Sequence, residues 1–252
     1  MYFDTHAHYD DEAFDADRDE LINSMRGKSV EFIVNPGCGK KSSLAAISMA
    51  EKYEFMWAAV GWHPQEADEY DECSPELLRQ WAKHPKVKAI GEIGLDYHYE
   101  PEKKELQRIV LREQLEIARE LELPVIIHDR EAHGDCMEIL SDFKDLRGVF
   151  HCYSGSLEMA EVLIGWGWYL SFTGAITFKN AKKAPAIIAA VPDDRYMLET
   201  DCPYLAPEPN RGHRNDSGLL PYIAEAVGRA RGITAEQAAK QALENGRRFF
   251  GI

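Results

Sequence analysis

The 252-residue sequence has no apolar run of the length that crosses a membrane, which takes about 18 uninterrupted apolar residues. Its first residues, Met1–Asp4, lack the basic segment followed by an apolar stretch that marks a secretory signal. The five cysteines are an odd number, and none of them forms a C-x-x-C pair. This pattern is typical of reduced thiols and not of a disulfide framework. We therefore expect a cytoplasmic protein that does not contact a membrane.

Positive charge is also scarce, because 29 Lys and Arg residues stand against 43 Asp and Glu residues, which gives a net charge of −14. An acidic chain gains little from counter-ion release, so we do not expect a protein that coats duplex nucleic acid. This balance still allows an enzyme that holds one phosphate or one strand end through bound metal. Nothing in the sequence requires an obligatory protein partner.

No Ser/Gly-rich linker or low-complexity segment interrupts the chain, so we expect a single domain over residues 1–252. Apolar or β-branched runs alternate about eight times with amphipathic segments, and one strand–helix unit takes roughly 30 residues. This pattern predicts an α/β fold, a (β/α)₈ TIM barrel. An open doubly wound sheet is the alternative, although no G-x-G-x-x-G motif opens the first helical segment. The expected strands are Tyr2–His6, Val30–Val34, Met56–Val60, Val87–Glu92, Val125–His128, Gly148–His151, Trp168–Phe172 and Tyr196–Thr200.

The clearest helical pattern covers Lys103–Glu122, and two more helices are expected near Leu219–Arg231 and Ala235–Phe250. Apolar residues in the first of these segments recur at spacings of three, four and seven, which indicates one buried helix face. The residues expected on that face are Leu106, Ile109, Val110, Ile117 and Leu121.

Side chains that can bind metal follow the expected strands at the point where each one ends. In a parallel barrel these ends emerge on one face, so residues far apart in the sequence would converge there. We therefore expect the metal site at the carboxyl-terminal ends of the strands. The candidates are His6, His8, His63, Glu92, His128, His151 and Asp201.

Each candidate taken alone has an ordinary explanation. The pair His6 and His8 would project to the same side of a strand, which polar positions of no special function also do. A salt bridge would satisfy Glu92 in its apolar surroundings as well as a cation would. A lone histidine after a strand is more often a core residue, and Asp201 before a proline-containing turn is a common turn residue. The repetition at one end of several strands is what favours a shared ligand.

Four imidazoles and two carboxylates suit Zn²⁺, Mn²⁺ or Fe²⁺, whereas Mg²⁺ prefers sites richer in oxygen. The six groups exceed the three or four that one catalytic zinc ion needs, so two divalent cations fit better than one. Two cations about 3.5–4 Å apart can hold the attacking and leaving oxygens of a hydrolytic displacement. The identity of the ions, whether zinc, manganese or magnesium, stays open.

The motifs that carry these residues resemble the TatD family of metal-dependent deoxyribonucleases, which belongs to the amidohydrolase-like barrels. The resemblance extends from Phe3 to the N-x-x-R-F sequence at 245–249. The motifs, in order, are F-D-T-H-A-H at 3–8, V-G-W-H-P at 60–64, I-G-E-I-G-L-D-Y at 90–97, I-H-D-R at 127–130, H-C-Y-S-G-S at 151–156, L-E-T-D-C-P-Y-L at 198–205 and R-G-H-R-N at 211–215.

The resemblance implies a role for each matching residue. His6 and His8 would bind the first metal with Asp201, and Glu92 would bridge both ions. The second metal would be held by His128 and His151, with His63 near the site as a contact either to the substrate or to a metal ligand. The implied activity is hydrolysis of DNA phosphodiester bonds, commonly as a 3′ exonuclease acting on DNA ends or single-stranded DNA.

One segment departs from the family pattern. After R-G-H-R-N the family usually continues with Glu-Pro, whereas this chain has Asp216-Ser217 and a shifted Pro221. We expect that loop to line the substrate entrance, so the departure concerns the substrate and leaves the metal ligands untouched.

The mechanism that we expect is attack on phosphorus by a hydroxide that the two metals activate, with Asp201 as general base and Glu92 as the second catalytic residue. Arg130, Tyr97 and Arg214 are candidates to position the phosphate, although each is more often an ordinary surface or salt-bridge residue. The same metal site could instead hydrolyse another ester or an amide. A non-catalytic metal-binding protein is the third alternative.

Overall fold

The computed structural model describes all 252 residues and contains one eight-stranded sheet with its strands in chain order. The pairs β1–β2, β3–β4, β4–β5, β5–β6 and β7–β8 run parallel. This is the strand order of a (β/α)₈ TIM barrel, so the fold expected from the sequence is confirmed. The strands are β1 (Tyr2–Asp4), β2 (Val30–Pro36), β3 (Met56–Val60), β4 (Val87–Asp96), β5 (Val125–Arg130), β6 (Gly148–Phe150), β7 (Tyr169–Phe172) and β8 (Tyr196–Leu198).

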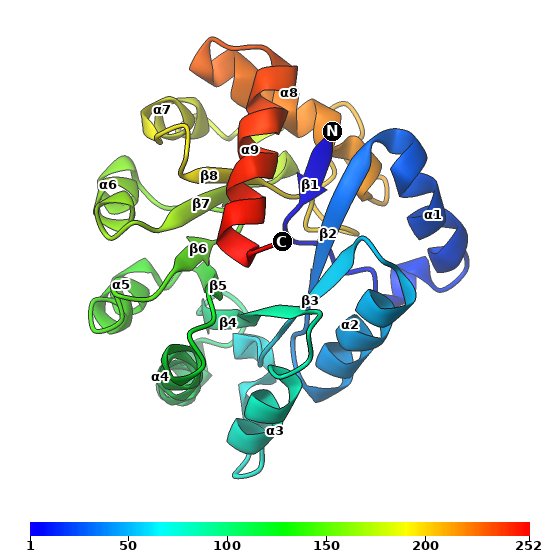
Figure 1. Cartoon of the computed structure of the whole chain (residues 1–252). Helices are drawn as coiled ribbons and strands as arrows, with labels where there is room; N and C mark the ends of the chain where they lie inside the picture. The colour runs from blue at the N-terminus through cyan, green and yellow to red at the C-terminus, as the bar shows by residue number, and fades with distance from the viewer. The chain divides into compact units, whose positions relative to one another are not determined.

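Helices alternate with these strands along the chain (Figure 1). The α-helices are α1 (Arg18–Ser24), α2 (Lys40–Lys52), α3 (Ser74–Trp81), α4 (Lys104–Glu120), α5 (His133–Leu140), α6 (Leu157–Gly165), α7 (Ala184–Ala190), α8 (Leu220–Arg231) and α9 (Ala235–Phe250). Short 3₁₀ helices are η1 (Glu12–Phe14), η2 (Met25–Lys28), η3 (Pro64–Glu69), η4 (Pro101–Lys103), η5 (Gly174–Thr177) and η6 (Ser217–Leu219). No helix has both the length and the apolar character needed to cross a membrane.

The eight expected strands all exist, and their ends differ from the expected ones by up to four residues. The largest difference is at the end of β4, which continues past Glu92 to Asp96. Its ten residues are almost entirely buried, as expected for a parallel strand covered on both faces. The extension matters for the site, because it carries a second acidic residue beyond Glu92.

The chain divides into two compact units, which we describe separately. The first unit joins Met1–Asn35 with Cys152–Ile252, and the second is Pro36–His151. The expectation of a single domain over residues 1–252 stays a prediction.

The core of the first unit lies where the C-terminal helix α9 meets β1, β7 and β8. Phe249 is fully buried, with its ring centroid 5.3 Å from that of Tyr169, and Phe250 lies 5.7 Å from Phe3. A capping box begins this helix, in which Thr234 and Gln237 satisfy each other's backbone N–H groups. Aromatic packing and the cap thus fix α9 against β1, which precedes His6 and His8, and against β8, which precedes Asp201.

The core of the second unit includes helix α4, on which Val110 and Ile117 are buried as expected, although another residue of the expected face is not. Ile109 is 62% exposed, so its assignment to that face was wrong. The observed face turns Val110, Leu111 and Leu115 inward together with two buried glutamines. Successive residues of an α-helix are about 100° apart around its axis, so Ile109 lies about 200° from the buried Gln107, on the opposite side of the helix.

We predict that Phe249→Ala lowers the free energy of unfolding by about 3–5 kcal/mol, because it removes a fully buried ring from the contact between α9 and the sheet. Chemical denaturation measures the change. The matched control is Leu44→Ala, which truncates a side chain that is 48% exposed and should change stability by no more than about 0.5 kcal/mol. Equal effects of the two substitutions would contradict this description of the core.

Candidate metal centre

Two imidazoles and a carboxylate converge in the first unit. His6 and His8 follow β1, and their Nε2 atoms lie 3.0 Å apart. The Asp201 Oδ1 atom lies 3.5 Å from His8 Nε2 and 3.8 Å from His6 Nε2. The three side chains are at most 15% exposed. Their nitrogen and oxygen atoms therefore face one small, shielded volume.

The backbone at Asp201 turns the carboxylate toward these histidines. Asp201 has a φ of +56°, in the left-handed region that Asp tolerates better than most residues. Its N–H donates to the carbonyl of His6 at 2.9 Å, and His8 N–H donates to the carbonyl of Cys202 at 2.8 Å. These two bonds hold the segment after β1 against the segment after β8.

A buried carboxylate beneath this group fixes the same two segments. Asp4 is fully buried and accepts hydrogen bonds from Thr200 N (2.9 Å), Thr200 Oγ1 (2.6 Å) and Ser217 Oγ (2.6 Å). Burial raises the pKa of Asp4 to about 7, although these hydrogen bonds act in the opposite direction. Asp4 thus orients the segments that carry the candidate ligands, and both of its own carboxylate oxygens are engaged by these hydrogen bonds.

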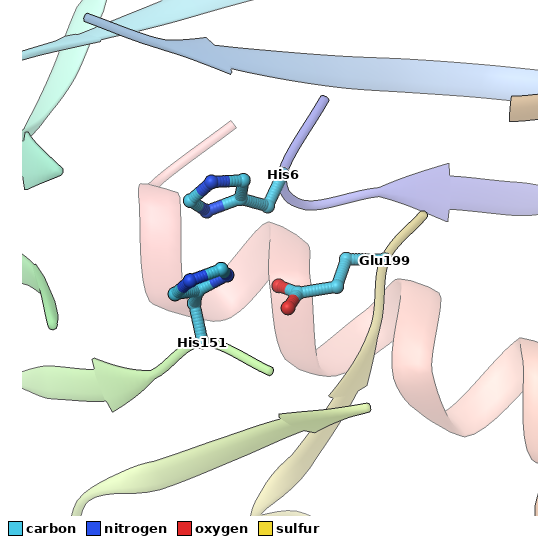
Figure 2. A group of neighbouring side chains, drawn as sticks. All are labelled: His6, His151 and Glu199. Carbon is cyan, nitrogen blue, oxygen red and sulfur yellow. The ribbon is translucent and has the colours of Figure 1, made fainter. Parts of the chain in front are cut away.

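Glu199 is a buried acidic residue that the sequence reasoning missed. It is 1% exposed and accepts a hydrogen bond from the backbone N–H of Cys152 at 2.6 Å. Figure 2 labels Glu199 and His6 of the first unit, together with His151 of the second, and shows the Glu199 carboxylate extending from the end of β8. Its signal in the sequence was its place in L-E-T-D, two residues before Asp201.

In the second unit three imidazoles surround the carboxylate of Glu92, which is 3% exposed. The Glu92 Oε1 atom lies 2.8 Å from His128 Nδ1, 3.1 Å from His151 Nε2 and 3.6 Å from His63 Nε2. His128 Nδ1 and His151 Nε2 are 3.4 Å apart. His63 follows β3, His128 lies within β5 and His151 follows β6, so the structure brings together four of the predicted residues.

Asp96 lies on the far side of the His128 ring and was also missed. Its Oδ2 atom is 3.1 Å from His128 Nε2, and its Oδ1 atom accepts from the N–H groups of His98 and Tyr99. Burial alone would lower the pKa of His128, but Asp96 and Glu92 together raise it. Burial acts to raise the pKa of Asp96, and its hydrogen bonds with His128 and these backbone groups lower it overall. Asp96 therefore orients the ring so that Nδ1 faces Glu92.

Two buried glutamines of α4 hold the strand ends that carry these ligands. Gln107 accepts from Asp96 N at 2.9 Å and donates to Asp96 O at 3.0 Å. Gln114 makes the same pair of bonds with Trp62, at 2.8 and 3.0 Å, directly before His63. Neither glutamine interacts with a ligand, so both act on the position of the backbone.

The predicted substrate contacts have different surroundings. His63 lies beside Glu92, and Tyr97 is 9% exposed with its hydroxyl donating to Asp135 at 2.7 Å. The guanidinium of Arg130 stacks 4.7 Å from the centre of the Tyr99 ring. Arg214 forms a two-bond ion pair with Asp17 at 2.6 and 2.7 Å. The assignment of these four residues to substrate stays a prediction.

The segment that departs from the family pattern is structural. Asn215 is fully buried and donates to the carbonyls of Thr200 and Tyr204. Asp216 caps η6, and Ser217 is buried against Asp4. The residues just before them, Gly212–Arg214, line an open groove of about 790 Å³ together with residues of the β1–α1 loop.

The donor sets of both units suit divalent transition-metal cations. Imidazole nitrogen and carboxylate oxygen are the ligands that zinc and manganese prefer, and Asp96 supplies the hydrogen-bond partner that metal-binding histidines usually have. In the second unit the ligand atoms of His63, Glu92 and His128 all lie within 4.8 Å of one another. A buried carboxylate among neutral imidazoles is costly unless a cation or donors compensate it.

Comparisons with known proteins agree with this chemistry. The model of the TatD related DNase family matches residues 3–251. The metal-dependent hydrolase YabD of Bacillus subtilis, itself described as uncharacterized, is 41% identical over the full length of both chains. The 3′-5′ ssDNA/RNA exonuclease TatD of Erwinia tasmaniensis is 33% identical over 95% of each chain.

A solved structure extends the agreement to three dimensions. The crystal structure of YJJV, a TatD homolog from Escherichia coli, superposes with a TM-score of 0.93 at 30% identity, covering all of this chain and 98% of the other. A hydrolase of the TatD family from Entamoeba histolytica has the same fold, with a TM-score of 0.90 at 20% identity. With the family model matched from end to end, the chain belongs to the TatD family of metal-dependent hydrolases, which act on ester bonds.

Proposed function

We propose that this protein is a deoxyribonuclease that hydrolyses DNA phosphodiester bonds at 3′ ends, with DNA ends or single-stranded DNA as substrate. The observation that carries the proposal is the buried carboxylate of Glu92 with three imidazole nitrogens within 3.6 Å of its Oε1 atom. The printed name of the relative from Erwinia tasmaniensis, a single-stranded DNA and RNA exonuclease, supports this substrate class. The five free cysteines fit a cytoplasmic enzyme.

The proposed centre joins the ligand groups of both units into one site for two cations. Its support is that β1, β4, β5, β6 and β8 belong to one sheet, and that every proposed ligand lies in the carboxyl-terminal half of its strand or in the segment directly after it. The first cation would be held by His6, His8 and Asp201, the second by His128 and His151, and Glu92 would contact both. When bound, the two cations lower the pKa of water and stabilise charge on phosphoryl oxygens.

The protein's own groups have separate tasks in this reaction. Asp201 accepts the proton of the attacking water, because its carboxylate is 15% exposed whereas that of Glu92 is 3% exposed. Asp96 keeps His128 Nε2 protonated and its Nδ1 free to bind. His63 is placed to donate a hydrogen bond from Nε2, since its Nδ1 accepts from the N–H of Gln65 at 3.2 Å.

We expect Glu92→Ala and Asp201→Ala to reduce hydrolysis of a labelled single-stranded oligonucleotide at least about 100-fold, because each removes a carboxylate that cations and water require. Gel electrophoresis of the products measures the rate, and circular dichroism checks the fold. Glu92→Gln keeps the side-chain shape and replaces Glu92→Ala in this test if the alanine variant is unstable. Glu51→Ala, at a carboxylate that is 60% exposed, is the control. Turnover near the wild-type rate in the two test variants would reject the proposal.

We expect a chelator to abolish hydrolysis and to lower the thermal midpoint, because cations that bind only the folded chain stabilise it by about 2.7 kcal/mol at a hundredfold excess over Kd. Adding back Mg²⁺, Mn²⁺ or Zn²⁺ singly should restore the hydrolysis rate and the thermal midpoint. The extent of recovery ranks the three ions. Elemental analysis of the treated protein confirms removal. Full activity in metal-free protein would contradict a metal-dependent reaction in this centre.

Asp96→Asn is expected to weaken metal binding by about 10–100-fold, because the amide cannot accept the His128 proton as a carboxylate does. Isothermal titration with Zn²⁺ gives the affinity, and excess metal should recover most of the activity. Asp142→Asn, at an exposed ion pair with Arg112, is the matched control. An unchanged zinc affinity in Asp96→Asn would show that the carboxylate does not position this ligand.

A further inference from the structure

Two loops of the first unit bring together cations that no carboxylate neutralises. Lys179 and Lys182 lie in the β7–α7 loop, and Arg211 lies in the β8–α8 loop. All three are exposed, and none of them forms an ion pair in the structure. In a chain of net charge −14, where Arg18, Lys28 and Arg214 are paired with acids, three unpaired cations on adjacent loops give a local excess of positive charge. We call Lys179, Lys182 and Arg211 the basic cluster.

Direct contacts join the two loops. The guanidinium of Arg211 lies 4.3 Å from the centre of the Phe178 ring, next in sequence to Lys179. The backbone N–H of Glu208 donates to Thr177 Oγ1 at 2.9 Å. Stacking on Phe178 holds the guanidinium plane and leaves its N–H groups available to an anion. Lys183 is left out of the cluster because it lies close enough to Glu158 to lower the pKa of that residue.

The loops also carry part of the candidate metal centre. Asp201 belongs to the β8–α8 loop, ten residues before Arg211. The β7–α7 loop begins at Thr173, whose Oγ1 lies 3.3 Å from Cys152 Sγ, next to the backbone N–H that binds Glu199. Loops at this end of a barrel form the walls of the substrate site. The basic cluster therefore lies on the wall that Asp201 shares.

The opposite side of the β8–α8 loop has the opposite charge. The open groove between this loop and the β1–α1 loop is lined by three carboxylates, and its Arg214 is already paired with Asp17. A phosphodiester chain is repelled along such a groove and attracted along the basic cluster. The lining residues are Asp11, Glu12, Ala13, Asp15, Pro203, Tyr204, Gly212, His213 and Arg214.

We infer that Lys179, Lys182 and Arg211 bind the phosphodiester backbone of a single-stranded nucleic acid whose end lies in the metal centre. The inference rests on the proposed nuclease function and adds to it the path by which the strand leaves the site. Cations that contact phosphates do not read the base edges, so the cluster makes affinity depend on the length of the strand and not on its sequence.

The test compares two substrates with the triple variant Lys179→Gln/Lys182→Gln/Arg211→Gln. One substrate is a single-stranded dT12 oligonucleotide, and the other is bis(p-nitrophenyl) phosphate, which carries one phosphate and no further strand for the cluster to bind. We expect the oligonucleotide-to-diester ratio of kcat/KM to fall about tenfold, mainly through KM. The slope of log(kcat/KM) for dT12 against log salt should become shallower by about 2, at about 0.7 per lost phosphate contact.

A matched control carries the same change in net charge elsewhere. Lys83, Lys144 and Lys240 are exposed and unpaired, and none follows the carboxyl end of a strand, so their triple glutamine variant should keep the wild-type ratio and slope. Glu12→Gln, on the acidic groove, should not weaken dT12 binding. The single variants Lys179→Gln and Lys182→Gln keep the test valid if the triple variant does not fold.

The outcomes separate this inference from the proposed function. If the triple variant keeps the ratio and slope of the control, or if both substrates lose activity in parallel, the inference is overturned. If the wild-type protein hydrolyses the diester but neither binds nor cuts dT12, the inference is overturned and a small-diester hydrolase remains. If the wild-type protein cuts neither substrate but binds dT12 through the cluster, measured by fluorescence anisotropy, the nuclease proposal fails and the binding surface stands.

Discussion

The constraint on which the rest of the site depends is the burial of the Glu92 carboxylate among imidazoles. Burying an isolated carboxylate costs several kcal/mol even after the protein relaxes, and His63, His128 and His151 are charged only when protonated. Three ring nitrogens that point at one carboxylate oxygen do not satisfy each other well by hydrogen bonds alone, because His128 Nδ1 and His151 Nε2 lie only 3.4 Å apart. The same arrangement becomes favourable once cations share the carboxylate, which gives a physical reason for metal dependence in this family member.

Such a site requires ligands that are held before any cation arrives, and a layer of buried polar groups does this. Asp4 accepts hydrogen bonds from Thr200 and Ser217. Gln107 and Gln114 each form a pair of hydrogen bonds with the backbone, at Asp96 and Trp62 respectively. None of these groups is left without a partner, so each stabilises the fold and fixes a strand end at the same time. The geometry of the proposed ligands is therefore set in part by buried residues that are not themselves proposed ligands.

Much of this could be predicted from the sequence. Eight apolar runs of about the right spacing indicated the barrel, and the candidate metal-binding residues at their ends indicated which end of the strands carries the site. Within each unit, His6, His8 and Asp201 meet, and so do Glu92, His128 and His151. The periodicity of 3.6 residues is coarse enough that Ile109 was placed on the buried face of α4, although it is 62% exposed.

The remaining features depend on pairings that a linear pattern does not contain. Asp96 and Glu199 were quoted within motifs, yet their contacts with His128 and with the backbone of Cys152 arise only from the register between neighbouring strands and loops. Arg214 looked available to a phosphate because Asp17, its partner, is 197 residues away in sequence. Arg211, which the motif reasoning passed over, is the arginine of that loop without an acidic partner.

The charge distribution is the last part of this description. An acidic chain repels a polyanionic substrate, so it needs local positive charge where that substrate binds. Bound cations would supply positive charge at the reacting phosphate, and the basic cluster would supply it for the rest of the strand.

The central claim remains the joint coordination of two cations. The most direct measurement is the anomalous scattering of Mn²⁺ in crystals grown with the metal. Two peaks, one beside His6, His8 and Asp201, the other beside His128 and His151, and both contacting Glu92, are the expected result. Ions bound elsewhere in the chain, or none in manganese-saturated crystals, would contradict the account.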